Sequence, residues 1–246
     1  MRNPIQLLKD SFAIFTEKPA LFVGIMLIPI ILSILVVLFE PPQNAVMFSV
    51  TDWIVFSLLS LVMIVVNVLM GAALILAIDN RSLTVPGAYK AAMPFFWRYL
   101  GLSILMGLIL LVGFILLIIP GVILSVWFAF ATMVLILERS GIVGSLRRSR
   151  EYVKGKWWGV FGRILVAILF AVLAMIVIVA IASFIPGGYL TGSVLSNIAS
   201  FIVAPVMLGY MYLMYQDIKG GQVVDPVPSF TSTPVTDVPP SQTSGV

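Results

Sequence analysis

The sequence predicts an all-helical integral membrane protein, with six transmembrane helices in three hairpins, each preceded by a cytoplasmic amphipathic interfacial helix. Three observations lead to this prediction: the composition, the apolar runs and the distribution of basic residues. The 246 residues are 61% hydrophobic and only 10% charged, whereas a soluble domain carries about 25% charged residues. A chain this apolar cannot cover itself with a surface that faces water, so we expect it in a membrane.

The apolar runs give the number of predicted spans, because a helix needs about 20 apolar residues to cross a bilayer. The fourth run is short: its 16 residues rise only about 24 Å, against a hydrocarbon core of about 30 Å. Six runs free of Asp, Glu, Lys and Arg are found, at Ala20–Phe39, Trp53–Ile78, Leu100–Ile119, Val122–Leu137, Ile164–Ile185 and Val194–Tyr215.

The basic residues give the predicted orientation. All 14 Lys and Arg lie before the first run, between the second and third, between the fourth and fifth, or after the sixth. Basic loops stay in the cytoplasm, so both termini and both long loops are predicted there. The remaining connections should be short outer turns, since Pro and Gly stop helices and permit tight turns. The predicted turn residues are Pro120 and Gly121, and Pro186 and Gly187.

An internal repeat underlies the three predicted hairpins. Before each one, apolar residues recur every three or four positions, as in one face of a helix. The first of these segments should begin with Asn3 as N-cap and Pro4 in its first turn, and Pro94 should bend or end the second. Each hairpin ends in an acidic residue soon followed by a basic one: Asp79 and Arg81, Glu138 and Arg139, Asp217 and Lys219.

The domain organisation follows from this repeat. We predict one six-helix membrane domain over residues 1–219, made of pseudo-repeats at about 1–82, 83–140 and 141–219. Residues 220–246 are rich in Pro, Ser and Thr and lack an apolar period. Such a composition is typical of disorder, so we expect a cytoplasmic tail without fixed structure.

The composition also argues against several kinds of chemistry. The chain has no Cys and no His, and its predicted spans carry no ionisable residue, which is where intramembrane catalysis would need one. We therefore expect no enzyme, with no catalytic residue, metal site or cofactor. Asn67 and Asn197 are the clearest polar residues within the spans. They line a cavity or form hydrogen bonds between helices.

The most basic stretch, residues 141–158, is the best candidate for a binding site. An apolar face, a basic face and a Trp pair at the end are typical of a helix at the membrane interface, and Arg147 can pair with Glu151 at i+4. The alternative is that these cations only orient the chain. We predict contacts with anionic lipid head groups for Arg147, Arg148, Arg150, Lys154 and Lys156, with Trp157 and Trp158 as interfacial anchors.

Residues 119–162 also carry a family resemblance. They resemble the membrane domain of glycerophosphoryl diester phosphodiesterase and related uncharacterised six-span bacterial proteins. The shared pattern comprises Pro120-Gly121, Trp127, Glu138, Leu146-Arg147-Arg148-Ser149 and Gly155-Lys156-Trp157. The resemblance implies a multi-pass module of a prokaryotic cytoplasmic (inner) membrane. It implies no phosphodiesterase activity, since that reaction belongs to a separate barrel domain, and we expect a standalone member without it.

Three functions are compatible with these observations. The leading hypothesis is a non-enzymatic protein that binds or organises anionic lipids at the cytoplasmic leaflet. A transporter or exporter of an apolar or amphipathic solute is the first alternative. A membrane scaffold for a protein partner, or for further copies of this chain, is the second. Nucleic acid is not an expected partner, because the basic patch is small and tied to the bilayer.

Overall fold

The structure is a computed structural model that describes residues 2–38, 50–182, 184 and 188–220. Within these ranges all regular secondary structure is helical. The helices are α1 (Pro4–Glu17), α2 (Pro19–Leu38), α3 (Val50–Asp79), α4 (Val85–Ala92), the 3₁₀ helix η1 (Met93–Phe95), α5 (Phe96–Leu116), α6 (Ile118–Trp127), α7 (Ala131–Leu137), α8 (Ile142–Val153), α9 (Trp157–Ala182) and α10 (Gly188–Gly220).

Five segments of the described chain are long and apolar enough to cross a membrane, by length and composition. The sixth predicted run lies within α10, whose side chains are described only from Val203 onward. The predicted tail falls outside the described residues from 221 onward. The five segments are Pro19–Val37, Val50–Asp79, Val85–Leu116, Ile118–Leu137 and Trp157–Ile181.

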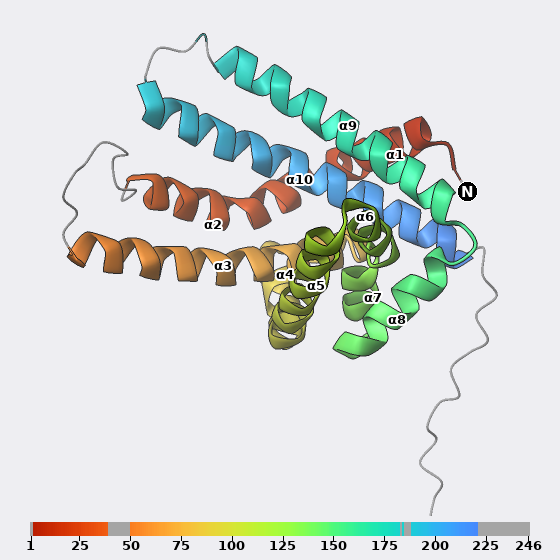
Figure 1. Cartoon of the computed structure of the whole chain (residues 1–246). Coiled ribbons are helices and arrows are strands. Elements are labelled where there is room, and N and C mark those ends of the chain that lie inside the picture. Colours follow the sequence, from red (N-terminus) through yellow and green to blue (C-terminus); the bar gives the residue numbers. More distant parts are fainter. Residues whose placement is uncertain (1, 39–49, 183, 185–187, 221–246) are drawn as a thin grey trace, which may run out of the picture.

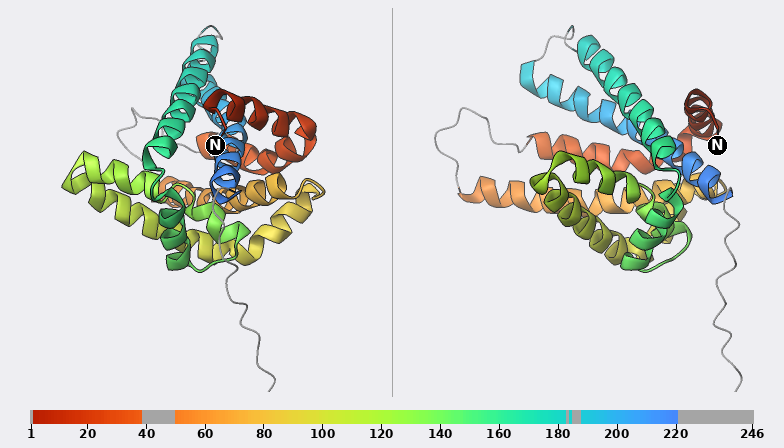
Figure 2. Two further views of the ribbon diagram at one scale, coloured as in Figure 1. Left: turned by 90° about the vertical axis from the view of Figure 1, so that its right-hand side faces the viewer. Right: turned by 45° about the vertical axis from the view of Figure 1, so that its right-hand side comes forward.

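Two directions dominate the arrangement of the helices. Helices α2, α3, α9 and α10 run side by side, and α10 packs against the other three (Figure 1). Helices α5 and α6 pack on each other as a separate pair that runs across this direction (Figure 2). Arg2 forms an ion pair of 2.9 Å with Asp217. The start of the chain and the end of α10 therefore lie at the same end of the molecule.

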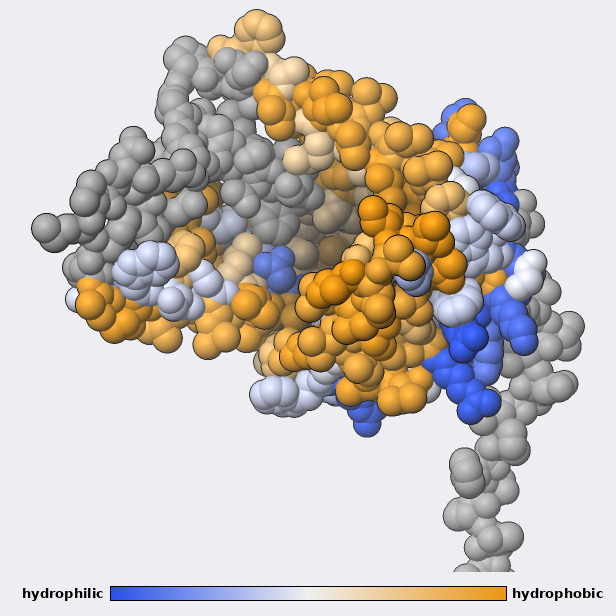
Figure 3. All heavy atoms as spheres, in the orientation of Figure 1, coloured by the Kyte–Doolittle hydropathy of each residue, from blue (hydrophilic) through white to orange (hydrophobic). Residues whose placement is uncertain are grey.

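The surface is divided between one hydrophilic end and a long apolar body. Hydrophilic residues gather at the end that carries α8 and the last turns of α10 (Figure 3). Elsewhere large apolar side chains are exposed along the helices, such as Ile31, Leu58, Leu108 and Leu173. Exposing this much apolar area to water would be strongly unfavourable, at about 25 cal/mol per Å². The body of the molecule therefore faces lipid.

The buried core lies close to the hydrophilic end. It joins Leu7 of α1, Ile25 of α2, Ile75 near the end of α3, Leu135 of α7 and Tyr210 of α10, all essentially inaccessible. Helix α7 is short, but five of its residues are buried there. The helices are thus packed together at this end, whereas their far ends are largely exposed.

Two helix boundaries confirm local predictions. The side chain of Asn3 accepts a hydrogen bond of 3.3 Å from the amide of Ile5, and Pro4 occupies the first turn of α1. Pro94 lies in the 3₁₀ helix between α4 and α5, so the predicted bend occurs. In both cases the proline follows its simple rule: it is tolerated in a first turn and it interrupts a helix interior.

The turn between α5 and α6 falls earlier than predicted. The backbone becomes extended at Leu117, with φ −167° and ψ 146°, so the chain reverses three residues before Pro120. Gly121 lies inside α6, where an added Cβ would stand 2.6 Å from the Phe114 ring. This glycine permits the close approach of the two helices and does not make the turn. Pro186 and Gly187 lie outside the described residues.

Candidate functional site

Helix α8 has one face toward the core and one face toward the surface. Ser145, Leu146, Ser149, Tyr152 and Val153 are buried. Their spacing of three to four residues places them on one side of the helix. On the opposite side the Arg147 side chain is 81% exposed and pairs with Glu151 at 3.2 Å, as the i+4 spacing predicts.

Arg148 turns inward, unlike its neighbour. Its Nη1 lies 2.7 Å from Oε2 of Glu138, whose side chain is only 7% exposed. Tyr152 and Tyr215 each donate a 2.6 Å hydrogen bond to the other carboxylate oxygen, and Lys219 Nζ lies 3.5 Å from it. We call these five residues the Glu138 network. It joins the end of α7 to α8 and α10, so Arg148 serves the fold and not the surface.

The protons in the Glu138 network have fixed positions near neutral pH. Burial would raise the pKa of Glu138, but the hydrogen bonds from Tyr152 and Tyr215 and the charges of Arg148 and Lys219 outweigh it and hold the pKa below the usual value. Burial and the adjacent carboxylate raise the pKa of Tyr152 to about 12. An ionised carboxylate between protonated phenols suits a stable ion pair and not proton transfer at neutral pH.

The other two repeated exit carboxylates also bind partners from distant segments. Asp79 accepts a 2.8 Å hydrogen bond from Tyr212 of α10. Asp217 accepts hydrogen bonds of 2.8 and 2.9 Å from the backbone and side chain of Arg2. Each acidic residue thus connects its own repeat to another one. The repeated acidic exit was visible in the sequence, but its partners were not.

A basic pocket lies on the outer side of α8. It has a volume of about 390 Å³ and is lined by Trp127, Arg147, Arg150, Glu151 and Lys154. The guanidinium of Arg150 lies 4.4 Å above the centre of the Trp127 ring, in the geometry of a cation–π contact. Three cations face one carboxylate around this pocket, which favours an anionic ligand.

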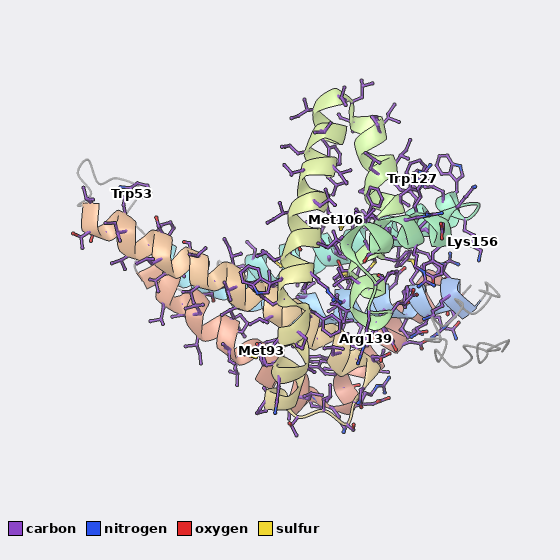
Figure 4. The ribbon with its side chains drawn as sticks, turned by 90° about the horizontal axis from the view of Figure 1, so that it is seen from below. Trp53, Met93, Met106, Trp127, Arg139 and Lys156 are labelled. Carbon is purple, nitrogen blue, oxygen red and sulfur yellow. The ribbon has the colours of Figure 1, made fainter. Side chains whose placement is uncertain are left out.

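An apolar groove adjoins the basic pocket. It has a volume of about 600 Å³, and its wall contains almost no polar surface. Trp127 and Lys154 line both the groove and the pocket. Figure 4 shows Trp127 on α6 and Lys156 on the connection between α8 and α9. Lys154 and Gly155 of this connection line the groove, whereas Lys156 does not. The lining residues are Ile118, Ile119, Val122, Ile123, Trp127, Lys154, Gly155, Trp157 and Trp158.

The connection between α8 and α9 positions the tryptophans of the groove. Gly155 has φ +79°, a conformation that glycine adopts at low cost, and it lets α9 begin at Trp157. The Trp157 ring stacks on Phe161 with centroids 5.1 Å apart. Its buried Nε1–H finds no acceptor within the described parts of the chain.

The predicted site residues fall into separate groups. Arg147, Arg150 and Lys154 line the basic pocket, Trp157 and Trp158 line the groove, and Lys156 is half-buried on the connection. Arg148 belongs to the Glu138 network. Sequence reasoning missed Trp127 as the shared wall, although Trp127 belongs to the pattern on which the family resemblance rests.

Of the two polar span residues, the structure describes only the side chain of Asn67. Asn67 donates a 2.9 Å hydrogen bond to the carbonyl of Met63 in its own helix, and not to a neighbouring helix. The side chain of Asn197 lies outside the described residues. The predicted cavity between them therefore stays a prediction.

The all-helical fold and the exposed apolar body define a multi-pass integral membrane protein. The chain belongs to the uncharacterised protein family UPF0259, whose family model matches residues 31–216. It is 29% identical over 155 residues to a UPF0259 membrane protein of Pectobacterium carotovorum subsp. carotovorum (strain PC1). That match covers 61% of this chain and 60% of the relative. No solved structure matches. Neither match links the chain to the membrane domain of glycerophosphoryl diester phosphodiesterase.

Proposed function

We propose that this UPF0259 protein binds an anionic phospholipid of the cytoplasmic leaflet, without catalysing a reaction. The observation that carries the proposal is the common wall of the apolar groove and the basic pocket, formed by Trp127 and Lys154. A phospholipid has the same two parts, an acyl chain and a charged head group, joined end to end. One molecule can therefore occupy the groove and the pocket at once.

The charges around the pocket suit a phosphate head group. Arg147 and Arg150 can each offer a planar pair of N–H donors to phosphate oxygens, and Lys154 adds a third cation. Each cation near an anionic lipid surface contributes about 1 kcal/mol. The apolar groove keeps the acyl chain in an apolar environment beside the pocket, so it positions the chain while the cations supply the attraction for the head group. Head-group charge and chain burial thus act together at one place.

The proposal places α8 at the cytoplasmic interface, with both termini on that side. The clustering of hydrophilic residues at one end supports this placement (Figure 3), as does the predicted topology. The hydrogen bond of Asn67 to a carbonyl of its own helix gives no support to a transport path. The scaffold alternative stays a prediction.

Native mass spectrometry of the gently extracted protein tests lipid binding. The test variant carries Arg147→Gln, Arg150→Gln and Lys154→Gln. The matched control carries Lys9→Gln, Lys90→Gln and Arg98→Gln, which removes the same charge from exposed positions elsewhere. Phosphatidylglycerol and phosphatidylethanolamine are compared as ligands, and inorganic phosphate is added as a competitor.

The wild type and the control should retain phosphatidylglycerol in preference to phosphatidylethanolamine. The test variant should lose this retention by at least about tenfold, since three cations are removed. Equal retention by the test and control variants would overturn the proposal. Complete displacement of the retained lipid by inorganic phosphate would show that the site recognises phosphate without a contribution from the acyl chain, which would overturn the role of the groove.

A further inference from the structure

The far end of the α5–α6 pair is a turn without polar side chains. From Ile104 to Leu124 the sequence contains no charged, amide or hydroxyl residue. Yet Ile115, Leu116, Leu117, Ile118 and Ile119 are 67–74% exposed at this turn. Exposing this apolar surface to water would cost about 25 cal/mol of free energy for each Å². The tip of the pair therefore belongs in hydrocarbon.

The backbone at the tip is also suited to hydrocarbon. The amide of Leu117 donates to the carbonyl of Gly113, and the amide of Gly121 donates to the carbonyl of Leu117. Backbone groups in lipid must find partners within the protein, and the chain reversal keeps these pairs. The predicted outer connection before α3 is different, since it contains Glu40, Gln43 and Asn44.

The returning arm is too short to cross the bilayer. Helix α6 has 10 residues, which rise about 15 Å, half of the hydrocarbon core of about 30 Å. At its end, Trp127 lies beneath the Arg150 guanidinium at 4.4 Å and beside Lys154. Tryptophan and these cations mark the membrane interface. The tip can therefore lie no deeper than about the bilayer centre.

Helix α7 does not extend this arm through lipid. The helix is interrupted after Trp127, and Ser149 bridges the break with two hydrogen bonds. Its hydroxyl donates a hydrogen bond of 2.7 Å to the Trp127 carbonyl and accepts one of 3.2 Å from the Phe130 amide. Beyond the break, five of the seven α7 residues are buried in the protein core. The lipid-facing part of the returning arm thus ends at Trp127.

The direction of the pair agrees with these lengths. Helix α5 has 21 residues, about 31 Å, so it must tilt strongly to keep its tip within half a bilayer. Figures 2 and 4 show α5 and α6 running across the direction of α2 and α3. Basic residues flank the pair on both sides: Arg98 lies in the first turn of α5, and Arg139 follows α7. The positive-inside rule is satisfied whether or not the pair crosses the membrane.

We propose that α5 and α6 form a re-entrant hairpin, which enters and leaves the membrane on the cytoplasmic side. Its exposed apolar surface contacts the acyl chains of the cytoplasmic leaflet alone, and its tip reaches the bilayer centre. Four helices, α2, α3, α9 and α10, then cross the bilayer. The hairpin therefore occupies volume in the cytoplasmic leaflet only, and the lipids of this leaflet are its interaction partner. This inference does not depend on the lipid site proposed above.

The absence of cysteine allows a direct test with single-cysteine variants of the full chain in sealed vesicles of both orientations. Ile119→Cys reports the tip, Asn44→Cys the predicted outer loop and Ser82→Cys the cytoplasmic side. A membrane-impermeant maleimide should label Asn44→Cys only from outside and Ser82→Cys only from inside. It should label Ile119→Cys from neither side until detergent is added.

Nitroxide depth measurements distinguish a central tip from one just beneath the outer surface. Spin labels at positions 119, 123 and 127 should be progressively shallower in that order, with 119 the deepest. Two crossing helices would place 123 deeper than 119. Labelling of Ile119→Cys from either side of the vesicle, or a label at 119 shallower than at 123, would overturn the re-entrant hairpin.

Discussion

The phenol of Tyr215 donates a 2.6 Å hydrogen bond to Oε1 of Glu138, a residue that lies 77 positions earlier in the chain. This contact ties the end of α10 to the end of α7 at the hydrophilic end of the molecule. Arg148 neutralises the same carboxylate from α8. A buried charge is tolerated only when it is paired and hydrogen-bonded. Glu138 therefore favours the arrangement of helices in which its carboxylate keeps these partners.

Replacing Glu138 should destabilise the protein strongly. Glu138→Gln leaves the largely buried Arg148 without its counter-ion, and breaking a buried pair in this way costs about 3 kcal/mol. Thermal unfolding in mild detergent measures the change. Glu151→Gln, on the exposed side of α8, is the matched control and should cost less than about 1 kcal/mol. Equal losses in the two variants would show that the Glu138 network does not support the fold.

The contribution of Glu138 should depend on pH in one direction. The pKa of the folded carboxyl lies below its usual 4.5, so its ionised form stabilises the fold. This stabilisation is complete well above pH 4.5 and is lost as the pH falls through the folded pKa. The difference in melting temperature between wild type and Glu138→Gln should therefore hold from about pH 7 to about pH 5.5 and then shrink down to about pH 3. A constant difference over this range would contradict the assignment.

The break between α6 and α7 should depend on Ser149. Ser149→Ala removes the hydroxyl that satisfies both the Trp127 carbonyl and the buried Phe130 amide. Leaving buried polar groups without partners costs about 1–3 kcal/mol. Ser125→Ala is a suitable control, because the Ser125 hydroxyl donates only to Val122 in its own helix. The unfolding midpoint should fall for the first variant and hardly change for the second.

Close packing of α5 on α6 should require Gly121. In Gly121→Ala the new methyl group would stand 2.6–2.8 Å from atoms of the Phe114 ring, and overpacking of this kind costs about 1–3 kcal/mol. Gly107 of α5 has no atom within 4 Å of the corresponding position. Gly107→Ala should therefore be neutral or slightly stabilising in the same unfolding assay. A neutral result for Gly121→Ala would mean that the two helices can separate without loss.

Local rules predicted part of the fold well. Asn3 and Pro4 begin α1, Pro94 ends the second amphipathic segment, and Arg147 pairs with Glu151 one turn away. These features depend on residues within one helical turn, which the sequence displays directly. The turn at Leu117 was missed, because Pro120 and Gly121 are common turn residues but are used here inside a helix for close packing.

The candidate site was predicted only as a group of residues. The sequence predicted head-group contacts for all five cations of this segment, and it did not separate the exposed cations from Arg148, which pairs with the buried Glu138. Arg148 and Arg147 are neighbours with the same chemistry, and only the position of Glu138 separates their roles. The apolar groove needs α6 beside the α8–α9 connection, and no local pattern records that approach.

By itself the sequence determined that this chain is a membrane protein, because its composition leaves too few polar residues to cover a surface that faces water. It also determined where α1 begins and where Pro94 interrupts the helix, because capping and proline effects act over a few residues. Only the tertiary structure decided that Arg148 turns inward while Arg150 covers Trp127, and that α5 and α6 lie across the other helices. Those outcomes depend on contacts between residues far apart in the chain, where burial and ion pairing outweigh local preference.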